Sequence, residues 1–204
     1  MSILLQQLNE EISALITKVG RSLVMVGNNR NGAGAGTILH ADGLILTNAH
    51  VVHHGFIEVT LPDKCQLPAR ILASDPELDL AALSVDAHDL ATIELGDSKN
   101  LQPGQLVFAL GHPWGIANAV TAGSIINVGL PPEISHGARE FVQAGLHLRP
   151  GHSGGPMVDV QGRLVGINTM ITGPEVGLAV PVHVVKNFLR DHLGIKPKRE
   201  ETYI

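Results

Sequence analysis

The feature that most constrains this chain is a row of short β-type segments, which begins near residue 22 and is broken repeatedly by Gly, Asp and Pro. In residues 56–62, FIEVTLP, apolar and polar side chains alternate as they do along a strand with one buried face. Ala41-Asp42-Gly43 is typical of a tight hairpin turn between two such segments. Roughly a dozen segments at this spacing predict an all-β fold of closed type. They divide about evenly around residues 97–104, so two β units of similar size are expected. The segments are SLVMVG, GTILHADGLILTN, FIEVTLP, LPARILAS, LAALSV, TIEL, QLVFALG, AVTAGSIINVG, EFVQAGL, PMVDV, RLVGINTMI and VGLAV.

Two helices are expected to flank the strands. Residues 3–18 carry apolar side chains at helical spacing, and Gly20 provides a stop signal. A second helix is expected to begin near Pro181 and to end at Gly194, because Pro is favoured at the start of a helix and Gly just past its end. The predicted organisation is an N-terminal amphipathic helix over 1–19, β units over 20–103 and 104–194, the second with its closing helix, and a polar tail over 195–204.

Charge and composition argue against several classes of function. The formal net charge is −5 and no basic block occurs, which argues against nucleic acid as a partner, because phosphate binding needs clustered Lys and Arg. The single Cys cannot form an internal disulfide. No apolar run approaches the roughly 18–20 residues of a membrane span. The polar stretch Gln6–Glu11 follows the apolar start too soon for a signal peptide, so a cytoplasmic location is expected.

No cofactor or metal is expected. The segment GAGAG, residues 32–36, lacks the spacing of a dinucleotide-binding loop and leads into a strand. His50, His53 and His54 form an H-x-x-H-H pattern that could suggest a metal site, but no set of carboxylate or Cys ligands accompanies them. A solvated loop is the preferred interpretation, and a His-rich metal-binding protein is a remote alternative.

The segment GHSGGP, residues 151–156, is the strongest indication of chemistry. A nucleophilic Ser on a turn needs neighbours that let the backbone approach a substrate, and the Gly residues around Ser153 permit this because they tolerate unusual backbone angles. Consecutive N–H groups can then point at one spot and form an oxyanion hole. Taken alone, the same segment could also be an ordinary surface turn.

A nucleophilic Ser also needs a base and a group that orients that base. Among the 11 His residues, His50 stands out because it follows a strand at the point where the chain turns. Two carboxylates are candidates for the orienting group. Asp75 precedes a Pro and is typical of a turn, whereas Asp79 directly enters an apolar strand, where a carboxylate is costly unless it has a partner. Asp79 is therefore preferred. The order His50, Asp79, Ser153 is that of chymotrypsin and differs from the α/β-hydrolase and subtilisin orders.

Several motifs in register resemble the protease domain of the HtrA/Deg family of chymotrypsin-like serine proteases, over about residues 20–190. The resemblance implies a double six-stranded β-barrel of chymotrypsin type, with the two barrels perpendicular and the triad in the cleft between them. It makes His50 the general base, Asp79 its orienter and Ser153 the nucleophile. It further implies an oxyanion hole built from the backbone N–H groups of Gly151, His152 and Ser153. The motifs are GAGAGTILHADGLILTNAHVV, SDPELDLAAL, LGDSKNLQPGQLVFALGHPWG, VTAGSI, RPGHSGGPMVDVQGRLVGINTMI and VGLAVPVHVVKNFL.

The resemblance also implies a pocket for the substrate residue that precedes the cut. Leu148 is expected to line this pocket, with Met170 and Ile171 as walls. No carboxylate stands there to receive Lys or Arg, so the predicted preference is for small or medium aliphatic residues. Asn168, Thr169 and Met170 are expected to pair with the substrate backbone as an added strand.

Two functions from different classes remain open. The first is a serine endopeptidase that acts on unfolded or peptide substrates in protein quality control. The second is a binding or chaperone-like module with little turnover, because His152 stands where the family usually has Asn and the oxyanion hole could be unformed at rest. The resemblance implies a homo-oligomer, a trimer by family. No PDZ domain fits within 204 residues, so residues 195–204 are either a polar tail or the start of such a domain.

Overall fold

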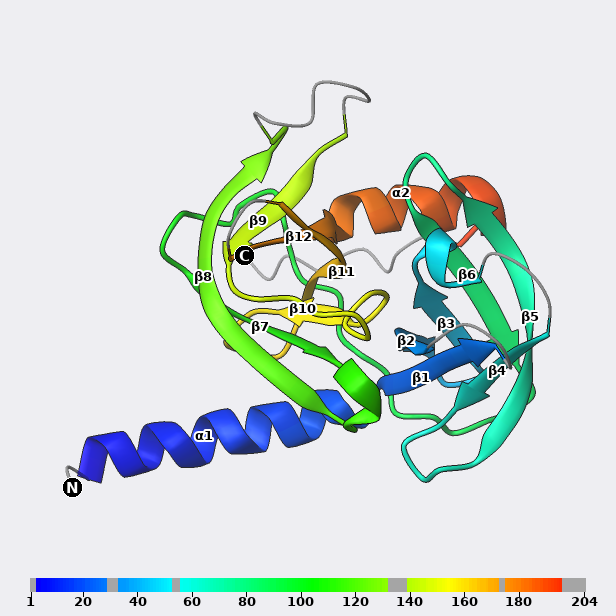
Figure 1. The fold of residues 1–204 in the computed structure, drawn as a ribbon, viewed down its shortest axis with the longest axis horizontal. Coiled ribbons are helices and arrows are strands. Elements are labelled where there is room, and N and C mark those ends of the chain that lie inside the picture. The colour runs from blue at the N-terminus through cyan, green and yellow to red at the C-terminus, as the bar shows by residue number, and fades with distance from the viewer. Residues whose placement is uncertain (1–2, 29–32, 53–55, 132–138, 173–174, 196–204) are drawn as a thin grey trace, which may run out of the picture.

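The computed structural model describes residues 3–28, 33–52, 56–131, 139–172 and 175–195. Its strands form two closed barrels that lie side by side (Figure 1). The first barrel contains β1 (Leu23–Asn28), β2 (Ala33–His40), β3 (Leu44–Thr47), β4 (Ile57–Thr60), β5 (Gln66–Asp75) and β6 (Leu80–Val85). The second contains β7 (Leu106–Gly111), β8 (Ala119–Gly129), β9 (Phe141–Gly145), β10 (Pro156–Val158), β11 (Leu164–Thr172) and β12 (Val176–Pro181).

Each barrel closes through antiparallel neighbours. The order is β1-β2-β3-β6-β5-β4 in the first barrel and β10-β11-β12-β9-β8-β7 in the second. The predicted hairpin turn connects β2 to β3, and Gly43 in it has φ +85°, a left-handed conformation that favours Gly. The expectation of a double six-stranded barrel with a helix at each end is confirmed.

The predicted strand TIEL does not form a full ladder. It is reduced to one parallel bridge between Leu95 and Leu164, flanked by hydrogen bonds from Leu164 N–H to Glu94 and from Gly96 N–H to Leu164. Both barrels close without this segment, so it adds no further strand to either of them. The boundary predicted between residues 103 and 104 falls in the same connection between β6 and β7 and stays a prediction.

Three apolar clusters fill the fold. One lies inside the first barrel and includes Ile38 and Leu83, and one lies inside the second and includes Val142 and Met157. The third cluster joins residues of both barrels to the two helices. Closely packed interiors resist sliding, so this third cluster holds the barrels in one relative position and with them any side chains at their junction.

The C-terminal helix α2 (Val182–Leu193) closes the second barrel. Pro181 stands at its N-cap, and Gly194 at its C-cap has φ +66° and donates its N–H to the carbonyl of Arg190 at 3.0 Å. Val182, Val185, Phe188 and Leu189 are buried against the third cluster. The predicted ends of this helix are therefore confirmed.

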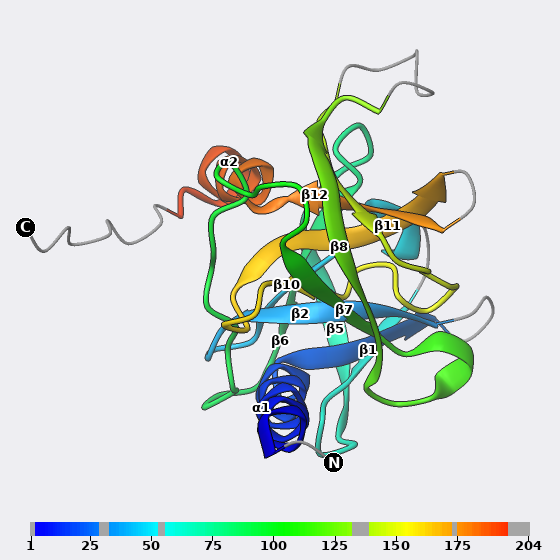
Figure 2. The same cartoon turned by 90° about the vertical axis from the view of Figure 1, so that its left-hand side faces the viewer.

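The N-terminal helix α1 (Ile3–Gly20) is the predicted amphipathic helix, and it extends away from the barrels (Figures 1 and 2). Only its C-terminal half contacts the third cluster, through the partly buried Ile12, Leu15 and Ile16 and the buried Val19. None of the helices in the described ranges is long and apolar enough to cross a membrane. The apolar side chains of its first turns are exposed, namely Ile3, Leu4, Leu5 and Leu8.

Candidate active site

His50 and Asp79 lie together because the strands beside them are paired. His50 belongs to the short 3-10 helix η1 (Ala49–Val52), which follows β3, and Asp79 directly precedes β6. In the β3–β6 ladder, Thr47 lies opposite Ala81. His50 Nδ1 is 2.9 Å from each carboxylate oxygen of Asp79, and the His50 backbone N–H donates to Oδ1 at 3.1 Å.

The surroundings of Asp79 favour its ionised form. Burial raises the pKa of this carboxyl, since the residue is only 6% exposed. Hydrogen bonds from His50 and from the Thr169 hydroxyl, 2.5 Å from Oδ2, outweigh burial and hold the pKa of Asp79 below its ordinary value. An anionic Asp79 favours the proton of His50 on Nδ1 and leaves Nε2 free to accept one.

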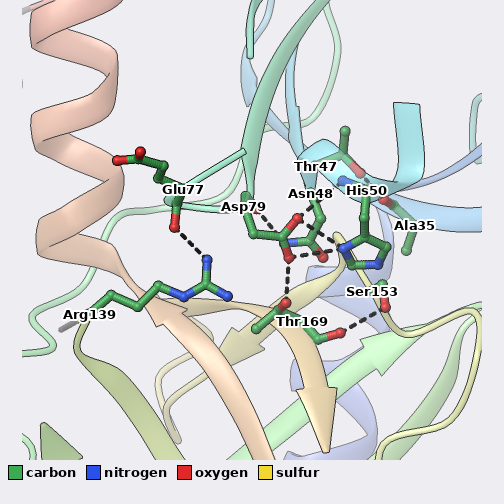
Figure 3. Close-up of polar contacts among 9 residues, drawn as sticks. All are labelled: Ala35, Thr47, Asn48, His50, Glu77, Asp79, Arg139, Ser153 and Thr169. Carbon is green, nitrogen blue, oxygen red and sulfur yellow. Dashed lines mark hydrogen bonds and ion pairs between the residues drawn. The ribbon is translucent and has the colours of Figure 1, made fainter. Parts of the chain in front are cut away.

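The backbone at Asp79 is held in an unusual conformation. Its φ is +54°, in the left-handed region that a residue other than Gly seldom adopts. Asp75 Oδ1 accepts the N–H groups of Glu77 and Leu78 at 2.9 Å, which forms the turn that leads into Asp79. Arg139 Nη1, from the second barrel, donates to the Glu77 carbonyl at 2.6 Å (Figure 3). The turn is thus restrained from within and from across the junction.

Ser153 reaches the same junction from the second barrel, on the loop between β9 and β10. Figure 3 shows it beside the imidazole of His50. Its hydroxyl donates to the carbonyl of Thr169 at 3.0 Å, and in the described part of the chain no hydrogen bond joins it to His50. Thr169 therefore contacts both Asp79 and Ser153, one through its side chain and the other through its backbone.

The turn before Ser153 presents backbone donors. The His152 N–H donates to the Arg149 carbonyl at 2.9 Å, and Gly151 in the turn has φ +104°. Pro150 followed by a residue of positive φ is the pattern of a type II turn. Among the described residues, the N–H groups of Gly151 and Ser153 have no hydrogen-bond partner. The predicted third donor, His152, is already engaged with Arg149 and is not free for an oxyanion.

Small residues let this loop approach the first barrel. The Ala35 N–H donates to the Ser153 carbonyl at 2.8 Å. A Cβ on Gly154, where φ is +85°, would lie 2.0 Å from the Ala35 carbonyl oxygen, and one on Gly34 would lie 2.7 Å from Val51 Cγ1. The GAGAG segment, predicted not to be a nucleotide-binding loop, supplies part of this close contact between β2 and the loop.

The predicted substrate-binding residues differ in how far their side chains are exposed. Leu148 is buried in the second barrel's apolar cluster. Asn168 is completely buried, and its amide donates to the carbonyls of Leu110 and Pro156. Thr169 is also buried, facing Asp79. Met170 is partly exposed and Ile171 is 45% exposed. Only the last two of the four β11 residues thus offer side chains to a substrate.

The sequence did not lead us to expect that Asn48 and Thr169 hold Asp79 through their side chains. Asn48 donates its side-chain amide to the Asp79 carbonyl at 2.9 Å, and Thr169 donates to the Asp79 carboxylate. Both belong to otherwise apolar segments, and a buried polar group there needs a partner. The argument that selected Asp79 could therefore have selected Asn48 and Thr169 as well.

The described residues contain no group of three or more His, Cys, Asp or Glu side chains able to hold a metal ion. His53 and His54, two members of the alternative metal pattern, lie outside the described residues. His50 itself is paired with Asp79.

Comparison with known proteins agrees with this geometry. The family described as trypsin-like peptidase domain matches residues 34–167. The chain belongs to this family. Two relatives named "Probable periplasmic serine endoprotease DegP-like" are 41% identical over 76% of the chain, from Halomonas elongata, and 42% identical over 74%, from Pseudomonas fulva. The chain spans only 34% and 33% of their lengths.

The solved structures support the same family placement. The structure described as "HtrA-type protease AlgW with decapeptide" superimposes with a TM-score of 0.81 and 27% identity, covering 89% of this chain and 67% of that one. The resemblance to HtrA/Deg proteases inferred from the motifs is confirmed by these relatives.

The expected cytoplasmic location is wrong by the same comparison. The Halomonas and Pseudomonas relatives are both named as periplasmic. The expectation rested on the polarity of Gln6–Glu11 near the start of the sequence given. Residues at that position carry no information about transport when the relatives are more than twice as long as this chain.

Proposed function

We propose that the chain is a serine endopeptidase that uses His50, Asp79 and Ser153 to hydrolyse peptide bonds through an acyl-enzyme. The Ser153 hydroxyl attacks the substrate carbonyl while His50 Nε2 takes its proton and then passes it to the leaving amine. A water molecule then attacks the ester in the same way and gives its proton to His50. The product acid leaves as His50 returns this proton to Ser153. Asp79 orients the imidazole and stabilises its charged form.

The observation that supports this proposal most strongly is the paired His50 and anionic Asp79 set beside Ser153 at the junction of the barrels. The Ser153 hydroxyl donates to the Thr169 carbonyl. Rotation of the Ser153 side chain would exchange this partner for His50. Catalytic hydrogen bonds commonly tighten only when the substrate binds.

The alternative of a binding module with a collapsed oxyanion hole has less support. In a type I turn the residue in the position of Gly151 has φ near −90°, whereas in a type II turn it has φ near +80°. The two turns differ by a flip of the peptide between Pro150 and Gly151, which reverses the direction of the Gly151 N–H. The observed φ of +104° favours the orientation that leaves this donor available.

We propose that the substrate binds as an extended strand along β11. In the described segments, β10 pairs with β11 only up to Ile167, and β12 covers the other edge. The edge at Met170 and Ile171 is thus open to backbone pairing. The aliphatic character of Leu148, Met170 and Ile171 supports cleavage after small or medium aliphatic residues.

The cellular role of the chain is proposed from the names of its relatives, and its assembly from the family resemblance. The names of the DegP-like relatives support a periplasmic endoprotease, and an open strand edge that reads backbone suits unfolded proteins as substrates. A homo-trimer stays a prediction, to be tested by light scattering of the purified protein.

Labelling with a fluorophosphonate tests the proposed function directly. Wild type should be labelled and should digest casein, and Ser153→Ala should do neither, with a loss of turnover of about a million-fold. Ser13→Ala, on the exposed face of α1, is the matched control and should behave as wild type. A chelator should leave digestion unchanged. Labelling that persists in Ser153→Ala, or wild type that is neither labelled nor active, would contradict the proposal.

A further inference from the structure

His152 is a buried histidine inside the loop that carries Ser153, and the triad does not use its side chain. It is 2% exposed. Its imidazole bends back to the first residue of the turn, with Nδ1 3.2 Å from the Arg149 N and 3.1 Å from the Arg149 O. The His152 backbone N–H also donates to the Arg149 carbonyl. The turn that positions Gly151 is therefore closed twice, once by backbone and once by the imidazole.

The hydrogen bonds favour one neutral form of this imidazole. With the proton on Nε2, Nδ1 accepts the Arg149 N–H, and only Nε2–H lacks a partner. With the proton on Nδ1, the ring can donate to the Arg149 carbonyl, which already accepts the His152 N–H, but the Arg149 N–H and the Nε2 lone pair are left without partners. Unpaired buried groups cost free energy, so the first tautomer is preferred. A doubly protonated ring could donate from Nδ1 to the Arg149 carbonyl, but it would leave both the Arg149 N–H and the Nε2–H unpaired.

The ionisable groups that act on His152 all oppose its protonation. Burial is the main cause that lowers the pKa of His152, a bond to the Arg149 carbonyl opposes that shift, and the charges of Arg149 and His147 lower it further. Arg149 is itself held over the Trp114 ring at 5.1 Å. From the neighbouring segment after β7, His112 is also buried, and the charge of His152 lowers the pKa of His112 in addition to burial.

The segment after β7 packs tightly on the same turn. The His112 N–H donates to the Gly151 carbonyl at 2.8 Å. A Cβ on Gly111 would lie 2.5 Å from His152 Cα, and one on Gly151 would lie 2.6 Å from the His112 carbonyl oxygen. With so little space, the turn cannot shift gradually to accommodate a charged ring. It must either keep His152 neutral or change conformation.

We propose that neutral His152 is a positioning residue, which locks the Arg149–His152 turn in the form that presents the Gly151 N–H to the reacting carbonyl. Protonation of His152 releases this lock and withdraws the donor, so acid inactivates the enzyme at the oxyanion hole. The inference rests on the proposed function for its effect on turnover, while the state of the imidazole is independent of turnover.

Nitrogen-15 NMR of uniformly labelled Ser153→Ala protein tests the state of the imidazole without any proteolysis. The His152 signal, identified by its loss in His152→Asn, should show the Nε2–H tautomer at pH 7 and should titrate below the ordinary histidine value of about 6.5. The Gly151 amide signal should follow the same titration. A charged His152 at pH 7, or a Gly151 amide that ignores its titration, would overturn the proposal.

Kinetics test the effect on turnover. His152→Leu, which cannot accept the Arg149 N–H, should lose about tenfold or more in kcat at pH 7.5 with KM within about twofold, since removing an oxyanion donor costs roughly 10²–10³-fold. His152→Asn offers an amide oxygen as acceptor and should restore kcat. At the acid end, the fall of log kcat/KM with pH should be steeper by one for wild type than for His152→Asn, which lacks one titrating group.

His88→Asn is the matched control, because this histidine follows β6 and its side chain is 72% exposed. It should keep the wild-type slope and kcat, and melting temperatures should show that all variants are folded. Full kcat in folded His152→Leu, or the wild-type slope in His152→Asn, would refute the positioning role. If no variant or wild type has Ser153-dependent activity, the proposed function fails, and the NMR titration still decides the state of His152.

Discussion

Replacing Thr169 by Val is expected to reduce kcat/KM about tenfold while the fold is kept. The Thr169 hydroxyl, in a residue 5% exposed, donates to Asp79 Oδ2 at 2.5 Å. Val has nearly the same shape and retains the carbonyl that accepts the Ser153 hydroxyl, so the substitution removes a single donor. A hydrogen bond to a charged group contributes roughly 1.5–3 kcal/mol, and about 1.4 kcal/mol corresponds to tenfold in rate. Because Asp79 keeps its bonds from His50, the lower end applies.

The same substitution should change the response of stability to acid. The folded-state pKa of Asp79 is lowered from 3.8, so its ionised form stabilises the fold above that value, and this stabilisation is lost as pH falls through the folded-state pKa. Loss of the Thr169 donor raises the folded-state pKa of Asp79. The variant should therefore be less stable than wild type at neutral pH, and the difference should diminish as pH falls through the folded-state pKa of Asp79.

The assays are kcat/KM on a peptide with an aliphatic residue before the cut, and urea unfolding at pH 7 and pH 3. Thr169→Ser keeps the hydroxyl and is the matched control, expected to retain most of the activity. Thr169→Val that equals wild type in both kcat/KM and urea midpoint at pH 7 would refute the role assigned to this hydroxyl.

Three further substitutions probe the loops and the closing helix. Gly151→Ala should abolish most turnover in a folded protein, since φ is +104° and the new Cβ would lie 2.6 Å from the His112 carbonyl oxygen; kcat and a melting curve measure this, and unchanged kcat would argue against the oxyanion turn. Arg139→Ala should lower kcat/KM several-fold, roughly 1 kcal/mol, by freeing the Glu77 carbonyl held at 2.6 Å, whereas the exposed Arg190→Ala should not. Gly194→Ala, at φ +66°, should cost about 1 kcal/mol and lower the melting temperature by roughly 2–4 °C without changing kcat/KM; an unchanged melting temperature would contradict the αL cap.

The local patterns predicted most of the elements because each depends on near neighbours. Alternating side chains and Gly, Asp or Pro between them were sufficient for the strands, and Pro181 and Gly194 for the ends of α2. The TIEL segment has the same local pattern but only one bridge, at Leu95. Both barrels close without this segment, and that closure is a property of the tertiary structure.

The residues of the site also differ in whether the local sequence could predict their roles. His50, Asp79 and Ser153 could be selected by residue type, since a carboxylate at the start of an apolar strand and a Ser between glycines are unusual. Thr169 was predicted to pair with the substrate through its backbone, and this stays a prediction. That its side chain donates to Asp79 could not be predicted, because the direction of a side chain follows from register and not from the neighbouring residues.

The sequence by itself determined the class of fold, the two helices and the residue types able to carry a nucleophile, a base and an orienting carboxylate, because those depend on periodicity and on the cost of burying polar groups. Only the tertiary structure decided which groups are already engaged. The Ser153 hydroxyl donates to the Thr169 carbonyl, and the Arg139 guanidinium donates to the Glu77 carbonyl in the turn before Asp79. Such partners come from distant parts of the chain, and only the packing of the two closed barrels brings them within hydrogen-bond distance.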